Sequence, residues 1–188
     1  MVRLGDRPVI AGCLVEAVHA GLEEIVFVVA PDKVELRSWL EANCPSTLRL
    51  HIVEQPEPEG ELDAILRGYR ATELRPLAVM MPDCCLFPSQ DGLKQLCDLA
   101  AVSERHLIGL IDMDAEIAGR VGGASRVVAG VPEASGARTL LSLERSAPPS
   151  SGLLTCFAEV HPIDFEDRMA VDQRAAVYYQ RLIGERMM

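Results

Sequence analysis

Positive charge is scarce in this sequence. Lys33 and Lys94 are the only lysines among 188 residues, and 28 acidic residues outnumber 18 lysines and arginines, which leaves a net charge of −10. Binding to nucleic acid depends on a dense positive surface that displaces counterions from phosphate groups. Attraction to an anionic membrane surface depends on the same charge. We therefore expect neither nucleic acid nor a membrane as a partner.

Long hydrophobic runs and an export signal are also missing. No apolar run approaches the roughly 20 residues that a membrane-spanning helix needs, and charged residues interrupt the N-terminal segment. The cysteines form no C-x-x-C pair and no zinc-ligand spacing; they are Cys13, Cys44, Cys84, Cys85, Cys97 and Cys156. Without an export signal, such thiols are expected to be reduced and buried. These absences predict a cytoplasmic protein.

Helical and strand periodicities alternate along the first part of the chain. Pro8 is a residue type favoured at the first helical position, and apolar residues at helical spacing follow it as far as Gly21. The predicted strands are 24–29, 48–53, 77–81 and 106–111, and the further helices are 31–42, 62–69 and 90–101. Strand–helix units of this length predict an α/β fold with a mainly parallel, doubly wound sheet.

The pattern changes after Asp112, where glycine-rich connections separate short apolar runs. Residues 126–131, 138–144 and 153–160 are predicted strands, of which the first two are expected to be antiparallel, and 170–183 is a predicted C-terminal helix. We expect one domain over residues 1–188. Its core would be about 1–112, and an antiparallel flap and the C-terminal helix would occupy about 113–188.

Two segments follow predicted strands at the position where doubly wound sheets bind ligands, outside the carboxyl ends of the strands. Asp83 follows the third strand directly after Pro82, which suits a carboxylate that holds Mg²⁺ together with phosphate oxygens. Gln55 begins the loop to Gly60 after the second strand, and its amide is able to read the edge of a base. The alternatives are a turn or helix-cap role for Asp83 and a solvated loop position for Gln55.

Five segments match or resemble the motifs of one known family, in the family's order. Residues 8–28 match "K-P-x-I…E-E-A…A-G-I-x-x-I", residues 55–64 match "Q-P-x-P-x-G-L-G-H-A" without gaps, and residues 77–87 match "A-V-L-L-P-D-D". Residues 127–130 and 143–145 resemble "Y-G-V-V-A-G" and "V-E-K-P". Over about residues 4–145, the chain resembles the sugar-nucleotide pyrophosphorylases, in particular the bacterial UTP–glucose-1-phosphate uridylyltransferases.

The resemblance implies a nucleotide-diphospho-sugar transferase fold. In that family a sugar 1-phosphate attacks the α-phosphate of a nucleoside triphosphate, with Mg²⁺ as cofactor, and pyrophosphate leaves. Carried over by position, Gln55 and Gly60 would bind the nucleotide base and Asp83 would be the metal ligand. Glu144 would hold the sugar, and Arg145 would stand where the family has a lysine near the sugar phosphate.

Several family features are replaced or absent in this sequence. A strand and a G-x-G-T-R loop with a following lysine precede the "K-P-x-I" helix in the family, and no such segment precedes Pro8 here. Leu62 replaces the second glycine of the "Q-P-x-P-x-G-L-G-H-A" motif. Cys84 replaces the second acidic residue of the "P-D-D" motif after the third strand. Backbone N–H groups and cations stabilise the transferring phosphoryl group. The resemblance thus predicts a catalytically impaired protein that binds or regulates.

Three other interpretations stay open. The first is an active nucleotidyltransferase whose missing cations come from elsewhere. The second is a structural or interaction subunit of an oligomer, and the third is a truncated gene product.

In the family's sheet the absent strand is central, beside the strand at 24–29. Its neighbours would either pair directly or leave unpaired edges that need cover. We therefore expect a homodimer or hetero-oligomer, with the sheet or the 170–183 helix in the interface.

Overall fold

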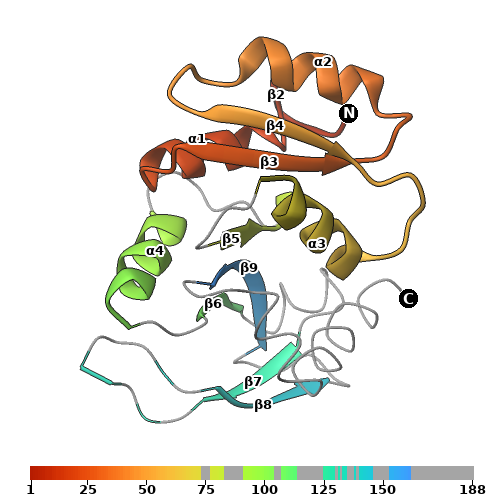
Figure 1. The fold of residues 1–188 in the computed structure, drawn as a ribbon. Helices are drawn as coiled ribbons and strands as arrows, with labels where there is room; N and C mark the ends of the chain where they lie inside the picture. The colour runs from red at the N-terminus through yellow and green to blue at the C-terminus, as the bar shows by residue number, and fades with distance from the viewer. Residues whose placement is uncertain are drawn as a thin grey trace.

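The computed structural model describes residues 1–72, 77–82, 91–103, 107–113, 125–129, 131, 133–134, 138, 140–145 and 153–161. Within these residues, helices and strands alternate along the chain and the strands form three separately hydrogen-bonded groups (Figure 1). The predicted C-terminal helix at 170–183 lies outside the described residues, as does Asp83. The fold is mixed α/β, as the sequence predicts.

The N-terminal elements begin with a short hairpin rather than with a helix. It consists of β1 (Arg3–Leu4) and β2 (Arg7–Pro8), which pair antiparallel. Pro8 was predicted to be the first helical residue; it lies in β2, and helix α1 begins at Ala11 and ends at His19. Gly5 allows the tight reversal because its φ of +63° is a conformation that residues with a Cβ avoid.

The following elements agree closely with the sequence periodicity. They are β3 (Glu24–Val29), α2 (Val34–Asn43), β4 (Arg49–Glu54), α3 (Glu61–Thr72), β5 (Leu77–Met80) and α4 (Gly92–Ser103). Then come β6 (Leu107–Met113), β7 (Ser125–Ala129), β8 (Leu140–Arg145) and β9 (Leu153–His161). The antiparallel pairing predicted for the two strands after Asp112 is confirmed by β7 and β8.

Strand β9 organises the larger sheet. It pairs with β6 along most of its length, with β5 near its C-terminal end and with β7 near its N-terminal end, always antiparallel. The parallel pair in the described part of the chain is β3 with β4, in the register that places Glu24 opposite Arg49. The Glu24 carboxylate also contacts the side chains of Arg49 (2.5 Å) and His51 (3.1 Å). These contacts join the first residues of β3 and β4. A doubly wound parallel sheet stays a prediction.

In both β3 and β5, alternate side chains pack against helices on opposite faces of the strand. Val26 and Val28 of β3 lie against Gly68 of α3, and Leu77 and Val79 of β5 pack against Ile65 and Tyr69 of α3. On the other face, the packing partners come from α1 and α4. Phe27 and Val29 share a buried cluster with residues of α1, and Ala78 and Met80 pack against Leu93 and Ala100 of α4. Both strands therefore lie in one layer between α3 and the α1–α4 side.

Two further findings bear on the sequence predictions. No helix in the described residues is long and apolar enough to span a membrane. Cys13, Cys44 and Cys97 are free thiols, and burial raises the pKa of the Cys97 and Cys44 thiols. A raised pKa lowers the thiolate fraction at neutral pH, so these two thiols are poor nucleophiles.

Leu40 offers a direct test of the core around β3. Its side chain is fully buried, whereas Leu4 in β1 is 68% exposed. We expect Leu40→Ala to lower the free energy of unfolding by about 2–5 kcal/mol, because the substitution leaves a cavity. Leu4→Ala is the matched control and should change stability by less than about 0.5 kcal/mol. Urea unfolding followed by circular dichroism measures both, and equal effects would contradict this description of the core.

Candidate functional site

The candidate site is the loop between β4 and α3, at the carboxyl end of the parallel strand pair. The Gln55 N–H donates to the Val29 carbonyl at 2.9 Å, which extends the β3–β4 ladder by one residue. The chain then runs through Gly60 into α3 (Figure 1). Because both strands end here, the start of the loop is held by the sheet while its middle lies at the surface.

The Gln55 side chain closes this loop on itself. Its Nε2 donates to the Gly60 carbonyl at 2.9 Å and to Asp63 Oδ2 at 2.9 Å. Both amide protons therefore have acceptors, which determines how the amide group is oriented. The remaining polar atom, Oε1, accepts no hydrogen bond from the described part of the chain. Among the described residues, Gln55 thus has a free acceptor oxygen, while both of its side-chain N–H donors are bound to Gly60 and Asp63.

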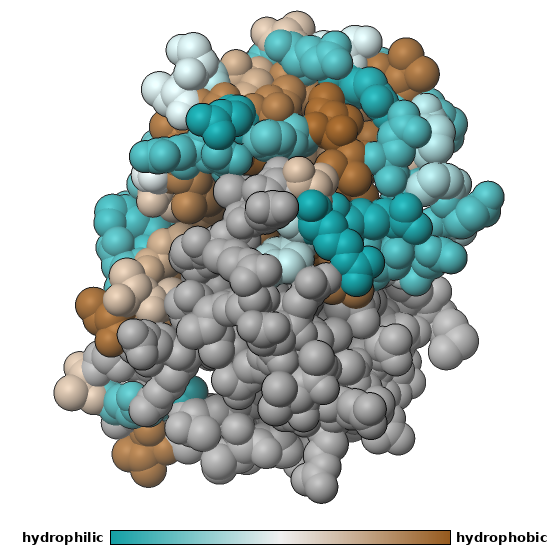
Figure 2. All heavy atoms as spheres, viewed as in Figure 1, coloured by the Kyte–Doolittle hydropathy of each residue, from teal (hydrophilic) through white to brown (hydrophobic). Residues whose placement is uncertain are grey.

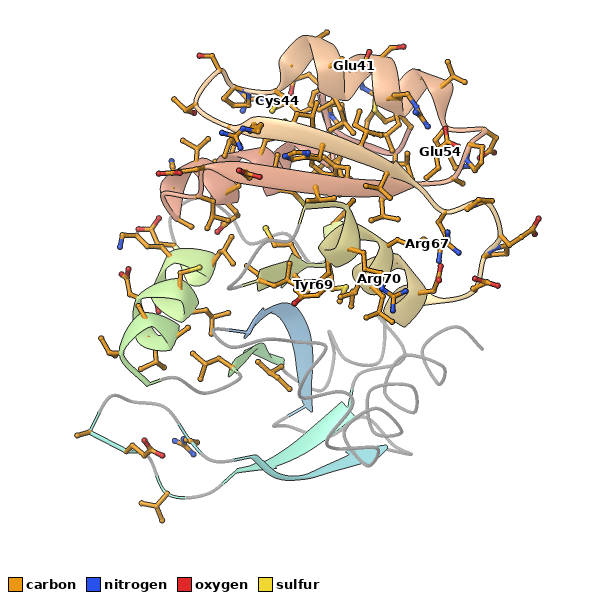
Figure 3. The ribbon with its side chains drawn as sticks, in the orientation of Figure 1. Glu41, Cys44, Glu54, Arg67, Tyr69 and Arg70 are labelled. Carbon is orange, nitrogen blue, oxygen red and sulfur yellow. The ribbon has the colours of Figure 1, made fainter. Side chains whose placement is uncertain are left out.

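A charge network on the first turns of α3 holds Asp63 in place. Arg67 donates from Nε to Asp63 Oδ2 at 2.5 Å and also pairs with Glu59 at 3.2 Å. Figure 3 shows Arg67 on the side of α3 that faces this loop. The hydrogen bond from Arg67, followed by that from Gln55, lowers the pKa of Asp63 below its ordinary value of 3.8. The carboxylate is therefore charged at neutral pH, and it raises the pKa of Arg67 in turn.

Gly60 forms the entry to α3. Its φ is +96°, so a residue with a Cβ would be strained at this position. Its carbonyl accepts from the Ala64 N–H at 3.3 Å as the first bond of the helix. The amides of a helix's first turn carry partial positive charge, which favours electronegative ligand atoms. On the face shown in Figure 2, the surface over α3 and its preceding loop is hydrophilic.

The other predicted site residues are described only in part. Asp83 lies outside the described residues, three positions after β5 ends at Met80. The backbones of Glu144 and Arg145 form the end of β8, opposite Arg126 and Ser125 of β7. The structure thus brings Gln55 and Gly60 together, and the proximity of the remaining three residues to them stays a prediction.

Sequence reasoning missed the contribution of Asp63 and Arg67 to the loop. The four-residue spacing of an acidic and a basic residue was a usable signal, since such pairs face each other on a helix. The bond from Gln55 to Asp63 had no comparable signal, because it depends on how the loop folds back.

A cavity elsewhere in the structure and possible metal-binding groups were the other candidates for chemistry. A cavity of about 520 Å³ lies between the β1–β2 hairpin, α1 and α2, and its polar lining includes Arg3, Arg7 and His19. None of its lining residues belongs to the Gln55–Gly60 loop. Among the described residues, no three His, Cys, Asp or Glu side chains are grouped closely enough to hold a metal ion.

Comparison with known proteins gives a consistent picture. No model of a known protein family matches the chain. A Bacillus subtilis (strain 168) protein, whose name provisionally assigns it as a UTP–glucose-1-phosphate uridylyltransferase, is 29% identical over 136 residues. This match covers 62% of the chain and 50% of the relative, so the chain spans about half the length of the curated relative that it matches.

Solved structures share the fold. A UTP-bound UDP-glucose pyrophosphorylase from Acinetobacter baumannii superposes with a TM-score of 0.67 at 22% identity, over 86% of this chain and 66% of the other. A UDP-glucose pyrophosphorylase in complex with UDP-glucose gives a TM-score of 0.66 at 20% identity, over 85% and 65%. The chain therefore shares the fold of these UDP-glucose pyrophosphorylases. It resembles the sugar-nucleotide pyrophosphorylases, as the sequence motifs predict.

The orientation of the Gln55 amide is expected to depend on pH through Asp63. Because its pKa is lowered, the Asp63 carboxylate accepts from Gln55 at neutral pH, and this interaction is lost only as the pH falls below 3.8. The two Gln55 side-chain amide protons should shift over that range in NMR spectra.

Asp63→Asn should abolish this titration. Asp98→Asn is the matched control, since Asp98 forms the corresponding four-residue pair with Lys94 on α4 (2.5 Å) and is remote from the loop in sequence. A Gln55 titration that persists in Asp63→Asn would show that another group holds the amide.

Proposed function

We propose that residues 1–188 form a uridine-nucleotide-binding domain of the UTP–glucose-1-phosphate uridylyltransferase type, which binds a nucleotide or sugar nucleotide and has impaired turnover. The resemblance to uridylyltransferases supports the class of ligand. The observation that carries the proposal is the oriented Gln55 amide at the carboxyl end of the parallel strands, with its donors occupied and Oε1 left to accept.

The oriented amide distinguishes bases by whether they present a hydrogen-bond donor or an acceptor to Oε1. Uracil carries an N–H donor at the ring position where cytosine carries a lone pair, so a fixed Oε1 acceptor pairs with uracil and opposes cytosine. Gly60, with its positive φ, leads directly into the first turn of α3. The N–H groups of a helix's first turn have no partner within the helix, so they would be donors for the carbonyl oxygens of the base. Gln55 and Gly60 are therefore the proposed base-binding residues.

The remaining parts of the proposed site follow from the resemblance. Asp83 would hold Mg²⁺, Glu144 would bind the sugar and Arg145 its phosphate. A single carboxylate directly after a strand has the hard oxygen donor that Mg²⁺ takes, and bound Mg²⁺ would neutralise phosphate charge. Arg145 offers a planar fork to a phosphate, where a lysine would offer a point charge.

Impaired turnover is proposed from the composition of these 188 residues. They contain no glycine-rich turn followed by an arginine and a lysine. Loss of one group that stabilises the charge of a transition state typically lowers the rate by a factor on the order of 10²–10³. A chain with several such groups absent is expected to bind its ligand far better than it converts it.

Calorimetry with UTP, CTP and UDP-glucose in the presence of Mg²⁺ tests the binding function. We expect the chain to bind UTP more tightly than CTP. Gln55→Ala should weaken UTP binding about tenfold, since one hydrogen bond is lost, and should erase the preference over CTP. Gln95→Ala on the exposed surface of α4 is the control. An equal loss for both nucleotides would assign Gln55 a structural role only, and absence of nucleotide binding would contradict the proposal.

Pyrophosphate release from UTP and glucose 1-phosphate tests the impairment separately. We expect little or no release from residues 1–188. Turnover at an ordinary enzymatic rate, abolished by Asp83→Ala, would show that the chain is an active nucleotidyltransferase. Neither binding nor turnover would favour the interpretation as an interaction subunit.

A further inference from the structure

The cavity beside the β1–β2 hairpin is a groove between two helices. Its α1 side is lined by Ala11, Leu14, Val15 and Val18. These positions have the spacing i, i+3, i+4 and i+7, so they form one continuous apolar stripe along the helix. At a rise of 1.5 Å per residue, the stripe is about 10 Å long. With a volume of about 520 Å³, the groove has the size of a small-molecule site.

The α2 side of the groove adds an aromatic residue. Trp39, Asn43 and Pro45 line this side. Trp39 is partly buried and packs against the core cluster that contains Leu14, which fixes it between the core and the groove. The Asn43 side chain donates from Nδ2 to the Trp39 carbonyl at 2.8 Å, and so it lies back over its own helix. The groove is therefore apolar on both helical sides, with an indole on one of them, and an aromatic ring packs well there.

Arg3 lies at the hairpin end of the groove. The β1–β2 register pairs Arg3 with Pro8, so their side chains share one face of the hairpin, and Pro8 is buried and lines the groove. One terminal nitrogen of the Arg3 guanidinium donates to the Asp6 carbonyl, which orients the side chain across the turn. Its other N–H groups have no partner in the described part of the chain. Unused donors of a cation thus adjoin the apolar walls.

The charge of the lining limits the charge of a ligand. The ionisable residues of the lining are Arg3, Arg7, His19 and Asp6. His19 is paired with Asp91 at 3.5 Å. Two guanidinium groups against one carboxylate leave a net charge of +1 at the groove, although the whole chain carries −10. One negative charge is neutralised here, whereas a second would meet the Asp6 carboxylate and the acidic protein around it.

We propose that this groove binds a small amphipathic carboxylate, with an aromatic body along the α1 stripe and its carboxylate group on Arg3. A guanidinium is a planar fork that donates two parallel hydrogen bonds to a carboxylate. Arg7 is opposite Leu4 in the ladder, and Leu4 is 68% exposed and does not line the groove. Arg7 therefore adds positive charge at the rim, and Arg3 makes the contact.

This proposal is independent of nucleotide binding, because no lining residue belongs to the Gln55–Gly60 loop. It assigns the chain a second ligand, of a different chemical class, on the face of the β3–β4 pair where α1 and α2 lie. Both helices pack against Phe27 and Val29 through the same buried cluster. A ligand that joins the hairpin to both helices would also stabilise this part of the fold.

A series of small ligands tests the groove on the unmodified chain without nucleotide. Trp39 is the only tryptophan in the sequence, so its emission and its single indole N–H signal in NMR spectra report on this site. We expect 3-phenylpropionate to change both saturably. The uncharged 3-phenyl-1-propanol and the bodiless acetate should each bind at least about tenfold more weakly. Phenyl phosphate, largely a dianion at neutral pH, should bind no more tightly than the carboxylate.

Arg3→Gln tests the contact with the carboxylate group. It should weaken binding of 3-phenylpropionate about tenfold or more and leave binding of 3-phenyl-1-propanol unchanged. Arg7→Gln should weaken the carboxylate only about two- to fivefold, as expected for a charge at the rim. Lys33→Gln is the matched control, since it removes one positive charge from an exposed position before α2 that does not line the groove. The variants are first checked for native circular dichroism.

Any of four results would overturn the proposal. The first is absence of a saturable change at Trp39. The second is equal binding of the acid and the alcohol to the unmodified chain, a comparison that remains valid if Arg3→Gln fails to fold. The third is an unmoved indole signal with shifts at the Gln55 amides, which would place the carboxylate at the candidate nucleotide site. The fourth is tighter binding of phenyl phosphate, because the groove would then select a dianion.

Discussion

The parallel register of β3 against β4 is the constraint on which the candidate site depends. The same ladder carries the Gln55 N–H to the Val29 carbonyl and so anchors the loop that ends at Gly60. Its odd residues pair with β4, which directs the backbone groups of Val26 and Val28 to the other edge. A shift of one residue would exchange these sets, and it would also turn Val26 and Val28 away from Gly68.

The described residues contain a connected polar network at the proposed base-binding residues. Gln55, Asp63 and Arg67 form a connected network in which each polar group determines the orientation of the next. Such preorganisation favours selective binding, because the loop does not have to be ordered by the ligand. Phosphoryl transfer needs a different kind of preorganisation, in which amides and cations surround the phosphates. The network around Gln55 is of the first kind.

Much of the fold was predictable from local pattern, and the exceptions have physical causes. The β3 and β4 segments were predicted to within one residue, because β-branched runs between turn residues specify strands locally. Pro8 was assigned to a helix on its preference for first helical positions, but the turn at Gly5 allows the hairpin and delays α1 to Ala11. For the site, the sequence identified Gln55 and Gly60, and it missed the network that orients them. That network joins residues eight and twelve positions from Gln55 through a loop whose path the sequence does not specify.

The sequence by itself determined the order of helices and strands and the resemblance to a family, since both reside in short segments that are read independently. Only the tertiary structure decided which edges are paired and which polar groups have partners. The antiparallel pairing of β9 with β5, β6 and β7, and the hydrogen bond from Gln55 to Asp63, depend on how segments distant in the sequence are assembled. Hydrogen bonding between distant strands is a property of that assembly, because each backbone group is chemically the same wherever it occurs in the chain.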